Sequence, residues 1–160
     1  MAETARQWIA NMSTFGLEIP SDQICVVPKG ASKRDALDML IDAVSTNPAV
    51  RDVAAFRKAV YEREAIQSTG IGEGIAIPHV RIPEITEATL GVGIAPHGID
   101  FDTLDNRPVQ VLVLFATPAN SDKEYLRLLA KVMLSLRNRD LFDGLVACKS
   151  KDEVFRLLNG

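Results

Sequence analysis

The stretch Ser68-Thr69-Gly70-Ile71-Gly72-Glu73-Gly74-Ile75-Ala76-Ile77-Pro78-His79 places three glycines at alternate positions ahead of a proline and a histidine. Glycine lets the backbone turn tightly and approach a neighbour closely, and the proline restricts the residue that precedes it. The chain has only two histidines, so this arrangement presents one imidazole at a defined point. From spacing alone a second interpretation stays open, namely a connecting loop followed by a surface histidine.

The length and composition bound the class of protein. The chain has 160 residues, enough for one domain with a substantial core. Its net charge of -3 supplies no basic field for nucleic acid. The two cysteines are far apart in sequence and form no Cys-x-x-Cys pair, as expected in a reducing compartment. With neither a membrane-spanning apolar run nor a signal peptide, the sequence predicts a cytoplasmic protein that is not embedded in the membrane.

Hydrophobic patterning predicts an α/β fold: a single domain whose mixed β-sheet has helices packed on both faces. We expect an N-terminal arm of uncertain structure over residues 1–22, and the domain over residues 23–160. Ser32/Asp35, Ser121/Glu124 and Ser150/Glu153 have the spacing of capping boxes, and Asn47 followed by Pro48 is a further helix start. The expected strands are 24–27, 88–94 and 110–116, and the expected helices begin near residues 32, 47, 122, 140 and 150.

The helix expected over residues 47–65 ends immediately before the glycine-rich stretch. Its apolar stripe is Val53, Phe56 and Val60, and the next position on that face is Arg63. Arg63 could aim its guanidinium at whatever the loop holds, or it could extend to solvent and complement the helix dipole. The local pattern favours the second reading. His97, in Pro96-His97-Gly98, is expected to be an exposed loop residue.

Several kinds of chemistry find no support in these residues. A metal site needs three or more ligands, whereas the glycine-rich stretch offers only His79 and Glu73. There is no Gly-x-Ser-x-Gly of a serine hydrolase and no Gly-Lys-Ser/Thr of a nucleotide-binding P-loop. Neither cysteine has the setting of an activated nucleophile. We therefore expect no cofactor and no metal, and the imidazole is left as the reacting group.

The run from Ser68 to His79 closely resembles the signature of type-2 enzyme IIA domains of the bacterial phosphoenolpyruvate-dependent phosphotransferase system (PTS), the fructose, mannitol and nitrogen-related group. Further matches are Glu62-Arg63-Glu64, the segment 98–102 and the helix over about 122–137. The resemblance covers roughly residues 24–159.

That resemblance implies a phosphoryl carrier. His79 aligns with the histidine that accepts a phosphoryl group from an HPr-type carrier protein, and in sugar systems the group then passes to a cysteine of a IIB partner. Arg63 aligns with an arginine near the phosphohistidine, where it would stabilise charge. Supporting positions are Thr69, Gly72 and Gly74 in the loop, and Tyr125 in the following helix.

Two positions depart from the family pattern. Where the family usually has a second histidine, in a Glu-His-Leu context, this chain has Glu124-Tyr125-Leu126. Tyrosine can donate a hydrogen bond to a phosphoryl oxygen but carries no positive charge. Val80 replaces a residue that is more often small, and it could narrow access to His79.

Two functions from different classes therefore stay open. The first is a phosphocarrier that passes phosphoryl onward, which is favoured by the loop together with His79 and Arg63. The second is a regulatory module of the nitrogen-related kind that docks to a transporter or kinase, which Tyr125 favours. Onward transfer to a cysteine carrier separates the two. A wholly inactive relative would take no phosphoryl group at all.

Overall fold

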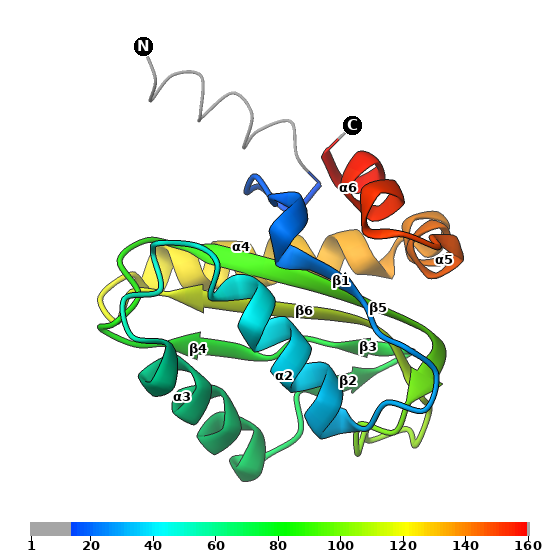
Figure 1. Cartoon of the computed structure of the whole chain (residues 1–160), viewed down its shortest axis with the longest axis horizontal. Coiled ribbons are helices and arrows are strands. Elements are labelled where there is room, and N and C mark those ends of the chain that lie inside the picture. The colour runs from blue at the N-terminus through cyan, green and yellow to red at the C-terminus, as the bar shows by residue number, and fades with distance from the viewer. Residues whose placement is uncertain (1–13, 160) are drawn as a thin grey trace.

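The computed structural model describes residues 14–159, which form a six-stranded mixed sheet between two layers of helices (Figure 1). This agrees with the α/β class expected from the sequence. The strands are β1 (Ile24–Val26), β2 (Gly70–Gly72), β3 (Ile75–Ala76), β4 (His79–Arg81), β5 (Thr89–Ile99) and β6 (Val109–Thr117). The helices are the 3-10 helix η1 (Ser21–Gln23), α2 (Lys33–Val44), α3 (Val53–Ile66), α4 (Asp122–Arg137), α5 (Arg139–Ala147) and α6 (Lys151–Asn159).

Strand β6 organises the sheet. It is the continuous apolar run expected of a strand covered on both faces, and seven of its nine residues lie in an unbroken buried stretch, Val111 to Thr117. On one side it pairs antiparallel with β5, which in turn pairs parallel with β1. On its other side β6 pairs parallel with β3 and then, further along, with β4. One strand thereby holds the second half of the glycine-rich stretch, from Ile75 to His79.

Helices α2 and α3 cover one face of the sheet, and α4 and α5 lie on the other (Figure 1). Helix α2 begins with the predicted capping box, because Ser32 Oγ accepts from Asp35 N–H and Asp35 Oδ2 accepts from Ser32 N–H. Its buried residues follow the helical repeat. They are Ala36, Leu37, Leu40, Ile41 and Val44.

Helix α3 begins later than expected, at Val53 rather than near Asn47. Asp52 is its N-cap and accepts from the N–H of Ala55. Asn47 instead closes a turn: its Oδ1 accepts from Ala49 N–H, and its Nδ2 donates to the side chain of Gln23. Between Asn47 and Asp52 the chain turns, and Val50 is buried there.

Two further expectations about elements need correction. Ser121 precedes α4 but caps nothing with its side chain, since its ψ of 56° departs from the extended backbone of an N-cap. Strand β5 runs to Ile99, past the predicted end at Ile94, with an irregularity in register between these two residues. His97 therefore lies on a strand, although it is exposed as expected.

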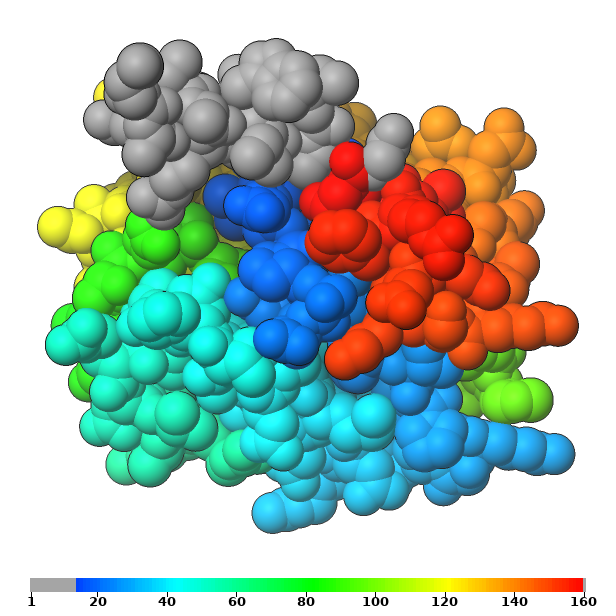
Figure 2. Space-filling model, turned by 45° about the horizontal axis from the view of Figure 1, so that its top comes forward, coloured from blue at the N-terminus to red at the C-terminus, as the bar shows by residue number. Residues whose placement is uncertain are grey.

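The first described residues pack on the domain. Phe15 and Ile19 are fully buried, and Thr14 N–H donates to the carbonyl of Leu158 in α6. Figure 2 shows this segment, in blue, lying against the red α6. Residues 14–22 of the expected arm are thus part of the folded domain as described, and residues 1–13 lie outside the described part of the chain. Across residues 14–159, no helix is both long and apolar enough to cross a membrane.

Candidate active site

His79 is the first residue of β4, at the edge of the sheet. Pro78 separates β4 from β3 because it has no N–H to donate to a ladder, yet its carbonyl accepts from Phe115 N–H of β6 at 3.0 Å. β4 then continues alongside β6 with His79 opposite Phe115. The predicted fixed exit after the proline is therefore an edge strand anchored to the central strand.

One ring nitrogen of His79 is committed to the backbone. Nδ1 lies 2.7 Å from the carbonyl oxygen of Ile77, two residues earlier. A carbonyl can only accept, so Nδ1 carries the proton in the neutral ring and Nε2 keeps its lone pair. The local turn at Ile77-Pro78-His79 thereby selects the tautomer in which Nε2 is the nucleophile.

Two aromatic rings hold the imidazole. The ring of Phe115 stacks on it, with centroids 5.5 Å apart and planes inclined by 19°. The ring of Tyr125, from the first turn of α4, is tilted against it at a centroid distance of 5.6 Å. Tyr125, which the sequence placed at the family's second-histidine position, is thus beside His79 and offers a phenol where an imidazole was expected.

The half-buried His79 opens into a hollow of about 360 Å³ between α3 and α4. Arg63 lines the same hollow, together with Arg81 and Tyr125. Its Nη1 donates to the carbonyl of Gln67 at 2.8 Å, which uses one guanidinium nitrogen and keeps the group at the end of α3. The structure therefore brings Arg63 and His79 to one hollow.

The pKa of His79 lies below its usual range. Partial burial of the ring is the main cause, since a charged imidazolium loses hydration there. The hydrogen bond to Ile77 opposes that shift, the positive charge of Arg63 reinforces it, and the negative charge of Glu64 opposes it. The resting imidazole is therefore neutral at physiological pH, as a nucleophile must be.

Arg81 was missed in the sequence. Its guanidinium lies over the ring of Tyr125, 4.9 Å from the centroid, and forms an ion pair with Asp122. Strand alternation could have found it, because residues 79 and 81 share one face of β4. A positive charge is thus present next to the position where the family carries its second histidine. Val80, between them, is buried and also lines the hollow around His79.

The buried face of α3 differs from the predicted stripe. Val53 is 42% exposed, and the buried residues are Phe56, Val60 and Glu64, at i, i+4 and i+8. Arg63 is therefore beside the stripe rather than on it, and a carboxylate continues it. Glu64 accepts from both the N–H and the hydroxyl of Thr69, at 2.9 and 2.7 Å. Thr69 thus anchors the start of the glycine-rich stretch.

Two glycines in the middle of that stretch lie away from His79. Gly72 and Gly74 have φ of 96° and 84° and form the tip of the β2–β3 hairpin. The Gly74 carbonyl accepts from Gln110 N–H, close to the start of β6, whereas His79 is opposite Phe115. Neither glycine lines the hollow around His79. Their role in the described structure is to turn the hairpin.

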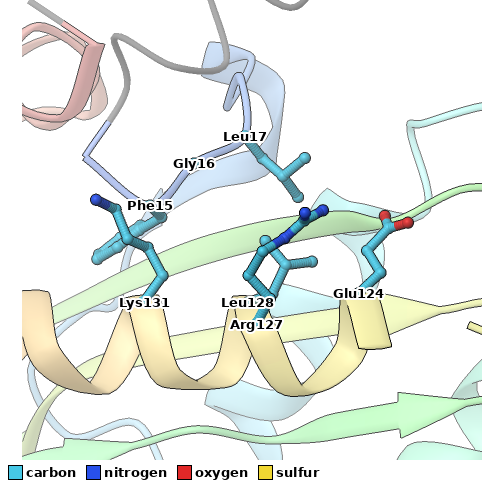
Figure 3. Close-up of a pocket in the computed structure, with 7 residues that line it drawn as sticks. All are labelled: Phe15, Gly16, Leu17, Glu124, Arg127, Leu128 and Lys131. Carbon is cyan, nitrogen blue, oxygen red and sulfur yellow. The ribbon is translucent and has the colours of Figure 1, made fainter. Parts of the chain in front are cut away.

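Another hollow, of about 310 Å³, lies on the opposite side of α4 between residues 15–17 and the helix (Figure 3). Figure 3 shows Glu124, Arg127 and Lys131 projecting from α4 toward the segment that carries Leu17. His79 does not line this hollow. Among residues 14–159, no group of three or more His, Cys, Asp or Glu side chains could hold a metal ion.

The fold and the site define a class: α/β domains in which one histidine is presented at a sheet edge between two helices. The family described as phosphoenolpyruvate-dependent sugar phosphotransferase system, EIIA 2, matches residues 19–160. The chain belongs to this family.

Named relatives fall into two groups. The chain is 31% identical over 135 residues to the PTS system fructose-specific EIIA component of Haloferax volcanii, covering 84% of this chain and 88% of the relative. It is 33% identical over 128 residues to a nitrogen regulatory protein of Escherichia coli K12, covering 79% and 78%. The family thus includes both sugar-specific and regulatory proteins.

Solved structures share the fold. The nitrogen regulatory protein IIA-Ntr of Neisseria meningitidis superimposes with a TM-score of 0.79 at 24% identity, covering 94% of this chain and 99% of that one. Enzyme IIA of the E. coli mannitol system, solved in complex with its phosphorylated IIB, gives 0.74 at 20% identity, covering 88% and 96%.

Proposed function

We propose that this protein is a phosphoryl carrier in which Nε2 of His79 accepts a phosphoryl group from an HPr-type carrier protein in the cytoplasm. One observation carries the proposal: the bond from Nδ1–H to the Ile77 carbonyl leaves Nε2 as the ring's free lone pair, beside the hollow that Arg63 and Arg81 line. Family membership supplies the class of reaction.

The transfer balances without help from an acid or base of this chain. The Nε2 lone pair forms a bond to phosphorus while the bond between phosphorus and the donor nitrogen breaks, and that electron pair stays on the donor. A donor ring protonated on its other nitrogen departs as neutral imidazole. His79, with a proton on Nδ1 and phosphorus on Nε2, becomes a phosphoimidazolium. The Ile77 carbonyl accepts from Nδ1–H before and after transfer.

Phosphoryl transfer asks the protein mainly for positioning and for stabilisation of charge on the transferring oxygens. Phe115 and Tyr125 hold the ring. Arg63 and Arg81 enter the same hollow from α3 and β4, so positive charge reaches the phosphoryl group from two sides. Tyr125 has a hydroxyl that can donate to a phosphoryl oxygen.

A second candidate is a regulatory module that docks to a transporter or kinase and transfers little phosphoryl group onward. The phenol of Tyr125 beside His79, in place of a second imidazole, favours it. A relative named as a nitrogen regulatory protein also favours it. If the protein is a carrier, the recipient of the phosphoryl group is a cysteine of a IIB partner, the kind of partner that the mannitol complex contains.

Incubation with enzyme I, HPr and labelled phosphoenolpyruvate tests both readings. We expect acid-labile label on His79, its loss in His79→Ala, and full labelling in the matched control His97→Ala. Label that persists in His79→Ala would place the acceptor elsewhere. Chasing the labelled protein with IIB proteins then separates the candidates, since a carrier gives up its label and a regulatory module retains it. No label on folded protein from several HPr-type donors would contradict the proposed function.

A further inference from the structure

Glu64 is a buried carboxylate that the phosphoryl transfer described above does not use. Its side chain is 5% exposed, and Lys33 Nζ, from the first turn of α2, pairs with its Oε1 at 3.0 Å. The same oxygen accepts from Thr69 N–H, and its Oε2 accepts from the Thr69 hydroxyl. A buried carboxylate with this many partners is held in one position.

Three hydrogen bonds, linked through Thr69 and Ile77, connect this carboxylate to the imidazole. Thr69 donates to Glu64 through its N–H, and its carbonyl accepts from Ile77 N–H at 3.0 Å. The Ile77 carbonyl accepts from His79 Nδ1 at 2.7 Å. At Thr69 and at Ile77 the N–H and the carbonyl belong to neighbouring peptide groups, so the connection between the hydrogen bonds passes through the Cα of each residue. The series therefore transmits position: the anchored Thr69 holds Ile77, and Ile77 holds the imidazole.

We propose that Glu64, paired with Lys33, is a positioning residue that acts through Thr69 and Ile77 to hold the Nδ1–H of His79 and to stabilise the positive ring formed on phosphorylation. Only the second part of this inference, the stabilisation of the phosphorylated ring, rests on the proposed function. The carboxylate touches neither His79 nor the phosphoryl group, so its effect on the reaction passes through the backbone of the glycine-rich stretch.

Lys33 makes the arrangement depend on two distant parts of the chain. Its ammonium also lies 3.6 Å from Asp102 and 4.6 Å from the ring centroid of Phe101. Helix α2 and the connector after β5 thus meet at the carboxylate that anchors the loop. Glu64 without Lys33 would be a buried charge with no counterion.

Other charges near the imidazole must be accounted for. Glu62 and Arg63 come from α3 and Arg81 from β4, and all three line the hollow that contains His79. Around Glu64 the charged groups are Lys33 and Arg34 from α2 and Asp102 from the connector. Asp42 is the control, because its side chain is 68% exposed, it is paired with Arg57, and it does not line the hollow around His79.

The test uses unphosphorylated full-length protein labelled with 15N-histidine, so it does not depend on any carrier. The chain has two histidines, and His97 is an internal reference. In Glu64→Gln we expect a smaller fraction of the Nδ1–H tautomer of His79 and a pKa lower than in the wild type, because a negative charge is lost. In Lys33→Gln the pKa should move the opposite way. The titration of His79 in Asp42→Asn and the signals of His97 should be unchanged.

Phosphorylation rates complete the experiment. Glu64→Gln should take up phosphoryl roughly tenfold more slowly than Asp42→Asn, as expected for a misoriented nucleophile. Lys33→Arg should restore the wild-type titration that Lys33→Gln loses. A lower Tm with an unchanged His79 titration and tautomer would mean that Glu64 only supports the fold, and would overturn the proposal. Absence of label in the wild type would count against the proposed function and leave the titration result standing.

Discussion

The imidazole of His79 lies parallel to the ring of Phe115, with centroids 5.5 Å apart and an interplanar angle of 19°. Phe115 belongs to the central strand and is fully buried, so the packed core of the sheet fixes the position of the reacting ring. The burial that fixes the ring also removes water from one of its faces, which is why the pKa of His79 is lowered.

Phosphoryl uptake should therefore persist in mild acid. With the pKa of His79 below the usual value of about 6.5, more than half of the acceptor is neutral at a pH where an ordinary histidine is half protonated. We expect the pH at which the rate measured by rapid quench falls to half its maximum to lie below 6.5. A midpoint above 6.5 would contradict this.

The lowered pKa of His79 also predicts how the free energy of unfolding depends on pH. Below pH 6.5 the unfolded chain protonates His79 before the folded chain does, so the free energy of unfolding falls as the pH drops and levels off below the folded pKa. Urea denaturation over this range, compared with His79→Gln, isolates the contribution. Identical pH dependence in the two proteins would show that His79 does not contribute.

Arg81→Gln should slow phosphorylation by roughly a hundredfold to a thousandfold, the usual cost of removing one group that stabilises transition-state charge. Stability should change by about 1 kcal/mol or less, because Arg81 is 42% exposed and surface ion pairs contribute little. Asp122→Asn is the control: it removes the ion pair and keeps the guanidinium. If both variants slow the reaction equally, the ion pair rather than the charge of Arg81 matters.

Replacing Tyr125 tests the family's second-histidine position. Tyr125→His replaces the ring whose centroid lies 5.6 Å from that of His79 with an imidazole, and should raise the rate of phosphoryl passage to a IIB cysteine. Tyr125→Phe keeps the aromatic ring under the Arg81 guanidinium but loses the hydroxyl. It should lower the rate of phosphoryl passage roughly fivefold, because one hydrogen bond to a phosphoryl oxygen is lost. Unchanged rates in both variants would mean that the position tolerates any ring.

Gly70→Ala should destabilise the protein by about 1–3 kcal/mol, the usual cost of overpacking. A Cβ at this position would lie 2.4 Å from Thr103 Cγ2. Thr103→Ser removes that methyl group and keeps the hydroxyl that donates to the Arg107 carbonyl. Urea denaturation of the four proteins in this cycle should show that the serine variant recovers most of the loss. Purely additive effects would contradict a steric cause.

Much of the fold followed from local patterns. The capping box at Ser32, the apolar run of β6 and the stripe of α2 are short-range features, and the structure confirms them. The predicted start of α3 was wrong because the Asn47 side chain accepts from Ala49 N–H in a turn and donates to Gln23. Gln23 is distant in sequence, so local patterns do not reveal this contact.

The residues of the site were likewise predicted only in part. The motif gave His79, and the structure places Arg63 and Tyr125 at its hollow. Arg81 and Glu64 were missed. Arg81 needed the strand register that puts residues 79 and 81 on one face, and Glu64 needed the true phase of α3, which the exposed Val53 disguised.

Thr14 and Leu158 are joined by two hydrogen bonds from Thr14, through its N–H and its hydroxyl. This junction lies beside β1, at the sheet edge across β5 and β6 from the edge that carries His79. A short linker between these two residues, with new ends opened in an exposed loop, should give a circular permutant with the site intact. Partner domains could likewise be fused near this junction without covering the imidazole.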